Sequence, residues 1–462
     1  MPTPSSKQSA TQTNNLKEPG DASVWATGTG SAFPNVGAFA ALKENGSVVT
    51  WGRSYEGYGG GDSSVVAHAL SDGVIQIFST TSAFAALKEN GSVVTWGASE
   101  DISIGNNGGN ASSVASELAG GVSQVFSTAL AFAALKEDGS VVTWGYDSYG
   151  GDSSAVADEL AGDVSQVFST REAFAALKVD GSVVTWGRDS YGGNSNAVAD
   201  ELSGGVSQVY SAGYAFAALK NDGSVVTWGD SGDRWNNAGD SSAVADKLSG
   251  GVIEIFSTPT AFAALKEDGS IVTWGNKYYG GDSSAVADEL SGGVIHVFST
   301  ANGFAALKKD GSVVTWGADS SAVAGEFSSG IVEIFSTAGA FAALKDDGSV
   351  ITWGDPYSGG DSKNIEEELS GGVSTIYSTQ NAFAALKEDG SIVTWGDPGY
   401  GGDSSSVADQ LSSGVVGFAS PFGTPYETGL GGLEGTPGED GEPIEEPEEP
   451  EEPEEPEEPE EP

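Results

Sequence analysis

Apolar and polar residues follow one repeated pattern over most of this 462-residue chain. A well-formed copy begins with the run Val164 to Ser169, which carries the Val and Phe side chains that β-strands favour. Two further apolar runs follow, Ala173 to Lys178 and Ser182 to Trp186, with Asp180-Gly181 between them. An Asp-Gly pair between two apolar runs is typical of a β-hairpin. The pattern therefore predicts three strands per repeat, the last two joined by a tight turn whose two central residues both have positive φ.

A short helix is predicted before the first strand of each repeat. In the same copy, Asp152 stands where its side chain would cap a helix, and Gly162 stands where the helix would end. Val156 and Leu160 are spaced by about one helical turn and would share one helix face.

The Phe-to-Trp segment occurs in nine copies, and the spacing from Phe to Trp is the same in all of them, as from Phe174 to Trp186. The copies end at Trp51, Trp96, Trp144, Trp186, Trp228, Trp274, Trp316, Trp353 and Trp395. The spacing from the Asp or Asn before each short helix to the next Trp is also constant, as from Asp152 to Trp186.

Only the stretch from each Trp to the following Asp or Asn changes in length. It is shortest from Trp316 to Asp319 and longest from Trp96 to Asn110. We therefore expect a packed frame of constant length and one loop of free length, the loop after Trp-Gly.

Three strands and a helical connection in each repeat are typical of β-propeller blades. Apolar side chains lie on both faces of the central strand, with Phe174 and Ala176 on one face and Ala175 and Leu177 on the other. Stacked sheets explain this pattern, because small Ala side chains allow close approach, and each Trp is then a core residue. We predict an all-β fold: a single β-propeller of three-stranded blades with short helical connections, with seven to nine blades drawn from the nine copies.

The motif Gly-Val-x-x-Val/Ile-Phe, followed by Ala-Phe-Ala-Ala-Leu-Lys-x-Asp-Gly-Ser-Val-x-Thr-Trp-Gly, resembles the regulator of chromosome condensation repeat. The resemblance covers about Asp21 to Ser420 and implies a β-propeller. The short repeat is similar to the bacterial branch of that family, which includes β-lactamase inhibitor protein II and implies three-stranded blades. The chain departs from the family at Ala173 and Phe174, near the place of its usual His, and after the Trp. The family usually closes seven blades, and none of its partner-contacting residues can be matched here.

A spare strand follows the ninth hairpin. Val415, Phe418 and Ser420 keep the offsets of a first strand, although Ala419 stands where an aromatic residue is expected and no hairpin follows. We predict that Val415 to Ala419 pairs with the hairpin Phe39 to Trp51 and completes its blade. Val24-Trp25 is the competing candidate for that place.

Composition divides the chain into three parts. Residues 1–20 are rich in Ser, Thr, Gln and Asn and are expected to be unstructured, residues 21–420 form the repeat domain, and residues 421–462 form an acidic Pro/Glu-rich tail. From Tyr426 to Pro462 there are 17 Asp or Glu and no Lys or Arg, a composition that cannot bury a core. The Glu-Glu-Pro triplets fit a polyproline II spacer, and a merely solubilising disordered tail is the alternative.

The formal net charge of −47 argues against binding nucleic acid or an anionic membrane. The absence of Cys excludes disulfides and thiolate chemistry, and the two His residues form no motif. No apolar run is long enough to span a membrane. We expect no catalytic residues, no cofactor and no metal, and hence no enzyme.

Variation between the repeats points to one end of the blades. The direction of the strands puts the residue pair before each central strand and the loop after each Trp at the same end, and both differ from copy to copy. Tyr, Trp and Arg, the residues that dominate interface energetics, gather there. The candidate binding face consists of Arg53, Tyr55, Tyr58, Tyr146, Tyr149, Arg188, Tyr191, Arg234, Trp235, Lys277, Tyr278 and Tyr279. The alternative is that these Tyr side chains pack on the adjacent loop and that the variation is drift.

We therefore expect a monomeric, non-enzymatic binding scaffold that recognises a protein or a glycan. The segment from Met1 to Gly30 lacks a signal peptide pattern, so we expect a bacterial cell-surface or extracellular protein without such a signal, or a cytoplasmic one. Two other functions stay open: an intracellular regulator of a small GTPase, which the family resemblance implies, and a calcium-dependent adhesin. The adhesin would use the Asp of Gly-Gly-Asp-Ser, which helix capping also explains.

Overall fold

The computed structural model describes residues 38–43, 45–53, 60–98, 106–230, 237–317 and 329–415. The chain divides into two units, Met1–Phe418 and Ala419–Pro462, and every described residue belongs to the first. The predicted N-terminal segment 1–20, the strand candidate Val24-Trp25, the predicted strand Val415 to Ala419 except its first residue, and the tail 421–462 lie outside the described residues, so those predictions stay predictions.

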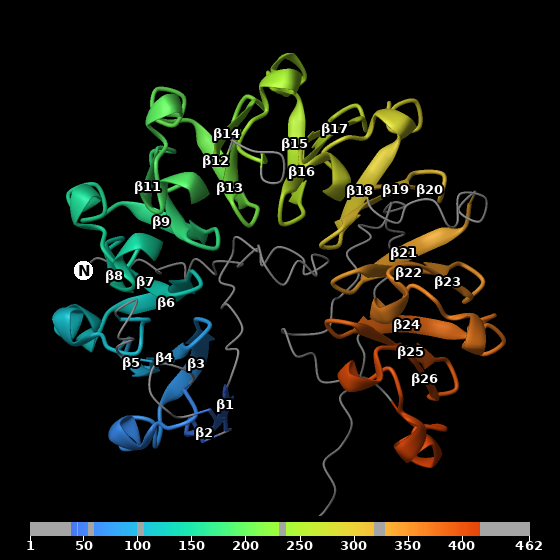
Figure 1. Ribbon diagram of the computed structural model, residues 1–462, viewed down its shortest axis with the longest axis horizontal. Coiled ribbons are helices and arrows are strands. Elements are labelled where there is room, and N and C mark those ends of the chain that lie inside the picture. Colours follow the sequence, from blue (N-terminus) through green and yellow to red (C-terminus); the bar gives the residue numbers. More distant parts are fainter. Residues whose placement is uncertain are drawn as a thin grey trace, which may run out of the picture. The chain divides into compact units, whose positions relative to one another are not determined.

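The described residues form nine antiparallel sheets, one per repeat, which follow one another in chain order from blue to red (Figure 1). Eight sheets have three strands and the first has two. The strands of the first five sheets are β1 (Ala38–Leu42) and β2 (Val48–Gly52); β3 (Val74–Ser79), β4 (Ala83–Lys88) and β5 (Val93–Gly97); β6 (Val122–Ser127), β7 (Ala131–Lys136) and β8 (Val141–Gly145); β9 (Val164–Ser169), β10 (Ala173–Lys178) and β11 (Val183–Gly187); β12 (Val206–Ser211), β13 (Ala215–Lys220) and β14 (Val225–Gly229). Those of the last four are β15 (Val252–Ser257), β16 (Ala261–Lys266) and β17 (Ile271–Gly275); β18 (Val294–Ser299), β19 (Gly303–Lys308) and β20 (Val313–Gly317); β21 (Ile331–Ser336), β22 (Ala340–Lys345) and β23 (Val350–Gly354); β24 (Val373–Ser378), β25 (Ala382–Lys387) and β26 (Ile392–Gly396). The predicted all-β fold of repeated, blade-like antiparallel sheets is confirmed.

The helical connections are 3₁₀ segments, so the prediction of helices capped directly by Asp152 and its counterparts needs correction. Asp152 precedes the N-cap residue Ser153, and its Oδ1 accepts a hydrogen bond of 2.9 Å from the backbone N–H of Ser154. In this turn, an Asp or Asn side chain accepts the backbone N–H two residues later, a local hydrogen bond that competes with those of a regular helix. The shared face of Val156 and Leu160 is confirmed, since Leu160 is buried and Val156 packs against the same cluster.

The 3₁₀ segments fall into two groups. Those before the first strands are η1 (Ser64–Val66), η2 (Ser112–Val114), η3 (Glu117–Ala119), η5 (Ser154–Val156), η7 (Asn196–Val198), η8 (Ser242–Leu248), η10 (Ser284–Val286), η12 (Lys363–Ile365) and η14 (Ser405–Gln410). Those after a Trp are η4 (Asp147–Tyr149), η6 (Asp189–Tyr191), η9 (Lys277–Tyr279), η11 (Pro356–Ser358) and η13 (Pro398–Tyr400).

The Asp-Gly hairpins have a three-residue loop, and the predicted two-residue turn is wrong. Lys178 donates its N–H to the carbonyl of Ser182, and Gly181 donates its own to the carbonyl of Lys178, both at 2.9 Å. Gly181 has φ +80°, whereas Asp180 does not have a positive φ. This is a type I turn followed by one left-handed Gly, which also satisfies an Asp-Gly signal. Asp180 instead accepts hydrogen bonds from the N–H and hydroxyl of Ser182.

The core lies between successive sheets, as the two apolar faces of the central strand predicted. Phe174, Ala176 and Trp186 pack on Ala133 of the preceding sheet, while Ala175 and Leu177 face the following sheet. In eight sheets the Trp side chain is buried. In seven of these the indole Nε1 donates a hydrogen bond to a backbone carbonyl in the loop that precedes the sheet, as Trp186 does to Gly150 at 3.1 Å.

The first sheet departs from this prediction, because its Trp51 is 49% exposed and its Phe39 is 65% exposed. The face that other sheets turn to their predecessor meets no preceding sheet within the described residues.

Backbone hydrogen bonds also join each sheet to the next. At the hairpin end, the N–H that opens each first strand donates to the carbonyl of the preceding turn Gly, as Val206 does to Gly181 at 3.0 Å. At the opposite end, Ala129 donates to the carbonyl of Arg171 at 2.9 Å, and Arg171 donates to that of Gly213 at 3.1 Å. Bonds of both kinds join the second to the sixth sheet in series and the seventh to the ninth, whereas Pro259 of the sixth sheet has no N–H to donate to the seventh.

Candidate functional site

The two variable loops of each repeat meet at one end of the sheet. In the fourth sheet, Arg188 follows the Trp-Gly pair and donates its N–H to the carbonyl of Glu172, at 2.9 Å, directly before the central strand. The corresponding bond is present in seven sheets, joining Ala98 to Ser82, Tyr146 to Leu130, Arg188 to Glu172, Asp230 to Tyr214, Asn276 to Thr260, Asp355 to Gly339 and Asp397 to Asn381. The sequence argument that these loops share an end is confirmed. We call this end the loop face.

Five side chains on the loop face form what we call the Tyr–Arg cluster: Tyr149, Glu172, Arg188, Tyr191 and Tyr214. They come from three successive sheets and from two kinds of loop. Glu172 is 4% exposed, and its Oε2 lies 2.5 Å from Nη1 of Arg188, whose side chain is 50% exposed. The guanidinium of Arg188 also lies 5.2 Å from the ring centre of Tyr191. A buried carboxylate thus holds a half-exposed cation over an aromatic ring.

The electrostatics of the cluster follow from that burial. The hydrogen bond to Glu172 raises the pKa of Arg188, which is therefore a permanent cation. Burial, followed by the negative charge of Glu172, raises the pKa of Tyr191 to about 12 and raises that of Tyr149 as well. Both phenols stay protonated at neutral pH, and Tyr149 lies close enough to Glu172 for the carboxylate charge to raise the pKa of its hydroxyl. The cluster therefore offers aromatic rings and a guanidinium without an anionic phenolate.

Tyr149 and Tyr191, which end the 3₁₀ segments η4 and η6, each lie beside the loop of the next sheet. The rings of Tyr191 and Tyr214 are 4.9 Å apart, and Tyr149 reaches Glu172 of the fourth sheet. Tyr146 packs on Tyr149 at 5.1 Å. Packing on the adjacent loop therefore accounts for part of the burial of these Tyr side chains, while Tyr146, Tyr149 and Tyr191 all keep part of their surface exposed.

The remaining predicted site residues lie apart from the cluster. Lys277 and Tyr278 belong to η9 of the sixth sheet, with Nζ of Lys277 lying 4.8 Å from the ring centre of Tyr278 and both residues exposed. Tyr279 is half-buried beside them, and Arg53 is exposed after the first sheet. The candidates Tyr55, Tyr58, Arg234 and Trp235 lie outside the described residues.

Glu172 and Tyr214 were missing from the predicted site. A signal for them exists in the sequence: the residue before the central strand and the first residue after Trp-Gly lie next to each other in the same repeat. These pairs are Ser82 with Ala98, Leu130 with Tyr146, Glu172 with Arg188 and Tyr214 with Asp230. Only the fourth of these repeats has an acid, Glu172, paired with a base, Arg188, and this pairing would have pointed to the fourth sheet as the place of the site.

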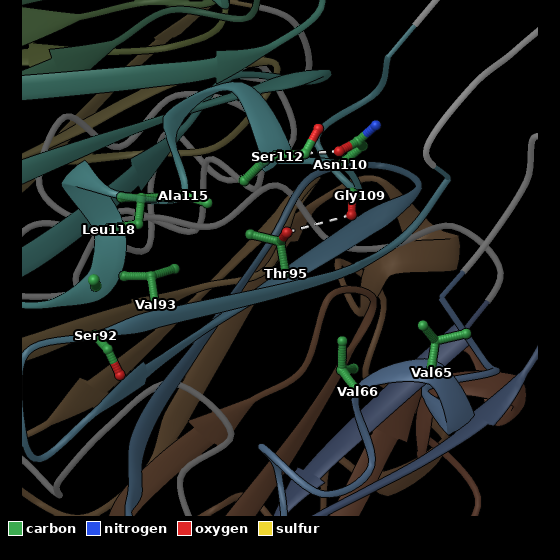
Figure 2. A pocket seen from close by; sticks show the side chains of 12 residues that line it. Val65, Val66, Ser92, Val93, Thr95, Gly109, Asn110, Ser112, Ala115 and Leu118 are labelled. Atoms are coloured by element: carbon green, nitrogen blue, oxygen red, sulfur yellow. Dashed lines mark hydrogen bonds between the residues drawn. The ribbon is translucent and has the colours of Figure 1, made fainter.

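A groove of about 440 Å³ lies away from the loop face, on the connection between the second and third sheets (Figure 2). Its walls are Val65 and Val66 in η1, Val93 in β5, and Ala115 and Leu118 of the next connection. Figure 2 shows the hydroxyl of Thr95 donating to the carbonyl of Gly109 across it. None of the described residues that line the groove is charged. Its polar groups serve the local turns, and we assign no ligand to it.

The Asp residues that precede the short 3₁₀ segments have structural partners. The side chains of Asp62, Asp240 and Asp282 each accept the N–H two residues on, as Asp152 does. In the part of the chain that the structure describes, no group of three or more His, Asp or Glu could hold a metal ion. Within the same residues, no helix is long and apolar enough to cross a membrane.

No family model and no curated protein sequence matches the chain. Solved structures do. The chain is similar to Prp20p of Saccharomyces cerevisiae, whose structure was described with its binding to Gsp1p and histones, at 16% identity and a TM-score of 0.31 over 51% of this chain and 72% of that one. It is similar at 16% identity and 0.31 to the ectodomain of the Arabidopsis thaliana receptor kinase ACR4, covering 64% of this chain and 99% of that one. For human WBSCR16 the values are 17% and 0.31, with 62% and 81% covered. The likeness to these repeat propellers extends to no partner or site.

Proposed function

We propose that the protein is a non-enzymatic binding scaffold whose loop face recognises a protein or a glycan. The observation that carries the proposal is the Tyr–Arg cluster. Within a frame that repeats the same strands, hairpins and inter-sheet bonds, the residues that differ most between sheets are brought together at one end. Loops held by a rigid scaffold are the usual place for binding residues.

The chemistry of the cluster suits recognition. Glu172 fixes one orientation of Arg188, so little side-chain entropy is lost when a partner contacts the guanidinium. Tyr side chains offer large rigid surfaces with one polar group each, and Tyr and Arg are enriched among the residues that carry binding energy. Arg171 lies exposed next to Glu172 and extends the cationic surface. A partner that accepts hydrogen bonds and presents a flat apolar surface fits this arrangement.

The test compares the two ends of the sheets. Arg171→Ala and Tyr146→Ala remove side chains at the rim of the cluster, and Tyr278→Ala removes the exposed ring of the sixth sheet. Val179→Ala and Glu137→Ala, both exposed at the hairpin end, are matched controls. Each variant is titrated against the ligands that the wild type retains from a glycan array and from a displayed protein library.

We expect at least one loop-face substitution to weaken binding by roughly tenfold or more, the cost of losing one well-placed contact. The hairpin-end substitutions should leave the affinity unchanged. Equal effects at both ends, or no effect at either, would argue for drift of the loops.

As part of the same proposal, the protein acts as a monomer at the surface of, or outside, a bacterial cell. Cell fractionation tests this location, and recovery only in the cytosol would contradict it. Regulation of a small GTPase and calcium-dependent adhesion stay predictions, because no particular observation favours either.

A further inference from the structure

Two of the four Arg residues of the chain lie together on the loop face. Arg188 belongs to the Tyr–Arg cluster, and Arg171 precedes Glu172 in the loop before the central strand of the same sheet. The charge of Arg171 acts on both Tyr149 and Tyr191, where it opposes the rise in the pKa of the two phenols. Two guanidinium groups and two partly exposed aromatic rings therefore lie close together, in a chain whose net charge is −47.

Both guanidinium groups keep hydrogen-bond donors that the described residues leave unused. Arg188 binds Glu172 through Nη1, and no second carboxylate acts on its pKa. Arg171 forms no ion pair with any residue that the structure describes, and its side chain donates no hydrogen bond to one. In six sheets, by contrast, the Lys that ends the central strand donates Nζ to a carbonyl of the preceding connection, as Lys178 does to Glu159 at 3.0 Å. Arg171 is therefore a cation that the frame does not use.

The positions from which the two cations project are fixed by neighbouring sheets. The backbone of Arg171 accepts a hydrogen bond from Ala129 of the third sheet and donates one to Gly213 of the fifth. The side chain of Arg188 is held by buried Glu172. Cations that are placed before a ligand arrives lose less conformational entropy when they bind it.

The positive charge is a property of this one sheet. At the position of Arg171 the seven other three-stranded sheets have uncharged residues: Thr81, Ala129, Gly213, Pro259, Ala301, Ala338 and Gln380. Asp147 and Asp189, in the loops of the cluster, are exposed, and neither is among the charges that act on the two phenols. The loop face therefore offers a local anion-binding surface within an acidic protein.

We propose that the Tyr–Arg cluster and Arg171 recognise a sugar acid, that is, a glycan residue whose ring carries one carboxylate. This inference rests on the proposed function, because it names the ligand class of the same loop face. A planar carboxylate matches the paired N–H donors of a guanidinium, and the apolar face of a sugar ring packs on an exposed Tyr ring. The protonated phenols supply hydroxyls for the hydroxyls of the sugar. A ring with one carboxylate is favoured over a densely charged acidic peptide, because the net charge of the whole protein repels polyanions.

Calorimetric titration of the full-length protein with matched ligands tests the inference. Tri-galacturonic acid and sialyllactose are each compared with their own methyl ester, which removes the negative charge and keeps the sugar. A hexaglutamate peptide tests the acidic peptide. Arg171→Gln removes the charge of the unpaired guanidinium, and Arg53→Gln, on an exposed Arg of the first repeat, makes the same change of net charge away from the cluster. Tyr146→Ala tests the loop face without changing its charge.

We expect at least one of the two acids to bind more tightly than its ester, and Arg171→Gln to weaken that binding about fivefold or more. Arg53→Gln should bind as the wild type does. If circular dichroism shows that Arg171→Gln fails to fold, Arg171→Lys serves instead, because it keeps the charge but loses the paired donors and should also weaken binding of the acid.

Three results would overturn the inference. Neither acid binds more tightly than its ester, or Arg53→Gln weakens binding as much as Arg171→Gln, which would indicate general charge attraction. Tighter binding of hexaglutamate than of both sugar acids would assign the site to an acidic protein segment. In each case the proposed function still stands if Tyr146→Ala weakens binding of a ligand that the wild type retains, and it fails separately if no loop-face substitution changes any affinity.

Discussion

The Glu172–Arg188 ion pair gives the sharpest test of how the loop face is built. Glu172 is buried and Arg188 is half-exposed, and the two side chains are hydrogen-bonded to each other. At the same two positions the second sheet has Ser82 and Ala98, with the same backbone hydrogen bond between them. The substitutions Glu172→Ser and Arg188→Ala, singly and together, therefore exchange one naturally occurring pair for another.

The expected magnitudes follow from burial. Removing one partner of a fully buried ion pair costs about 3–5 kcal/mol, because a charge is left unpaired. Since water reaches half of the Arg188 side chain and can enter the space that this side chain leaves, we expect Arg188→Ala to cost about 2 kcal/mol, less than the loss of one partner of a fully buried pair. Glu172→Ser leaves no buried charge and should cost about 1 kcal/mol. The double variant should be no less stable than Arg188→Ala, which corresponds to a coupling of about 1–2 kcal/mol.

Hydrogen exchange is the suitable assay, because stacked sheets can open one at a time and a single global unfolding energy need not exist. The free energy of opening is compared for the amides of β10 and β11 in the four proteins, with β25 as an internal reference. Additive effects, within about 0.5 kcal/mol, would refute the idea that the carboxylate is tolerated in the core only because Arg188 neutralises it.

Three further outcomes are expected. Gly181→Ala should cost about 2–4 kcal/mol in thermal denaturation, because Gly181 has φ +80° and an added Cβ would lie 2.8 Å from the backbone N of Gly205. Gly162→Ala is the control: no atom lies nearer than 3.9 Å to its added Cβ, so it should cost under about 1 kcal/mol, and equal losses would contradict the turn geometry. The hydroxyl and N–H of Ser182 lower the pKa of Asp180, so the ionised carboxylate stabilises the fold above its unfolded pKa of about 4, and this stabilisation is lost as the pH falls through the folded pKa. Asp180→Asn should therefore weaken the fall of Tm at acid pH, and an unchanged dependence of Tm on pH would count against this role of Asp180. Trp186→Phe removes the 3.1 Å hydrogen bond from the indole Nε1 to the carbonyl of Gly150 and should cost about 1–3 kcal/mol. Tyr357→Phe, on an exposed side chain, should cost almost nothing, and similar melting temperatures for the two variants would be evidence against a stabilising role of that bond.

Local structure was predicted well where residues close together in the sequence determine it. The two apolar runs on either side of Asp180-Gly181 form the hairpin β10–β11, and Phe174 and Trp186 face the preceding sheet as predicted. The turn type was wrong, because Asp-Gly fits both a two-residue and a three-residue loop. The register Leu177 opposite Val183 decides between them, and that register depends on the whole sheet.

The candidate site shows the same division. Tyr149, Arg188 and Tyr191 were predicted from their type and their loop. Glu172 and Tyr214 were not, because an acid and a phenol before a strand look like ordinary surface residues in the sequence. Only the stacking of three sheets brings these five side chains together and buries the carboxylate that orients Arg188.

The sequence alone determined the number of repeats, the frame of constant length, the hairpins and the buried Trp of eight sheets, because each of these depends on contacts that recur with the repeat. The tertiary structure decided what breaks the repetition. Trp51 has the same neighbours in sequence as Trp186, yet it is half-exposed while Trp186 is buried. The physical reason is that a blade buries its faces against other blades and not against itself, so the environment of a residue is set by the sheet stacked on it and not by its own repeat.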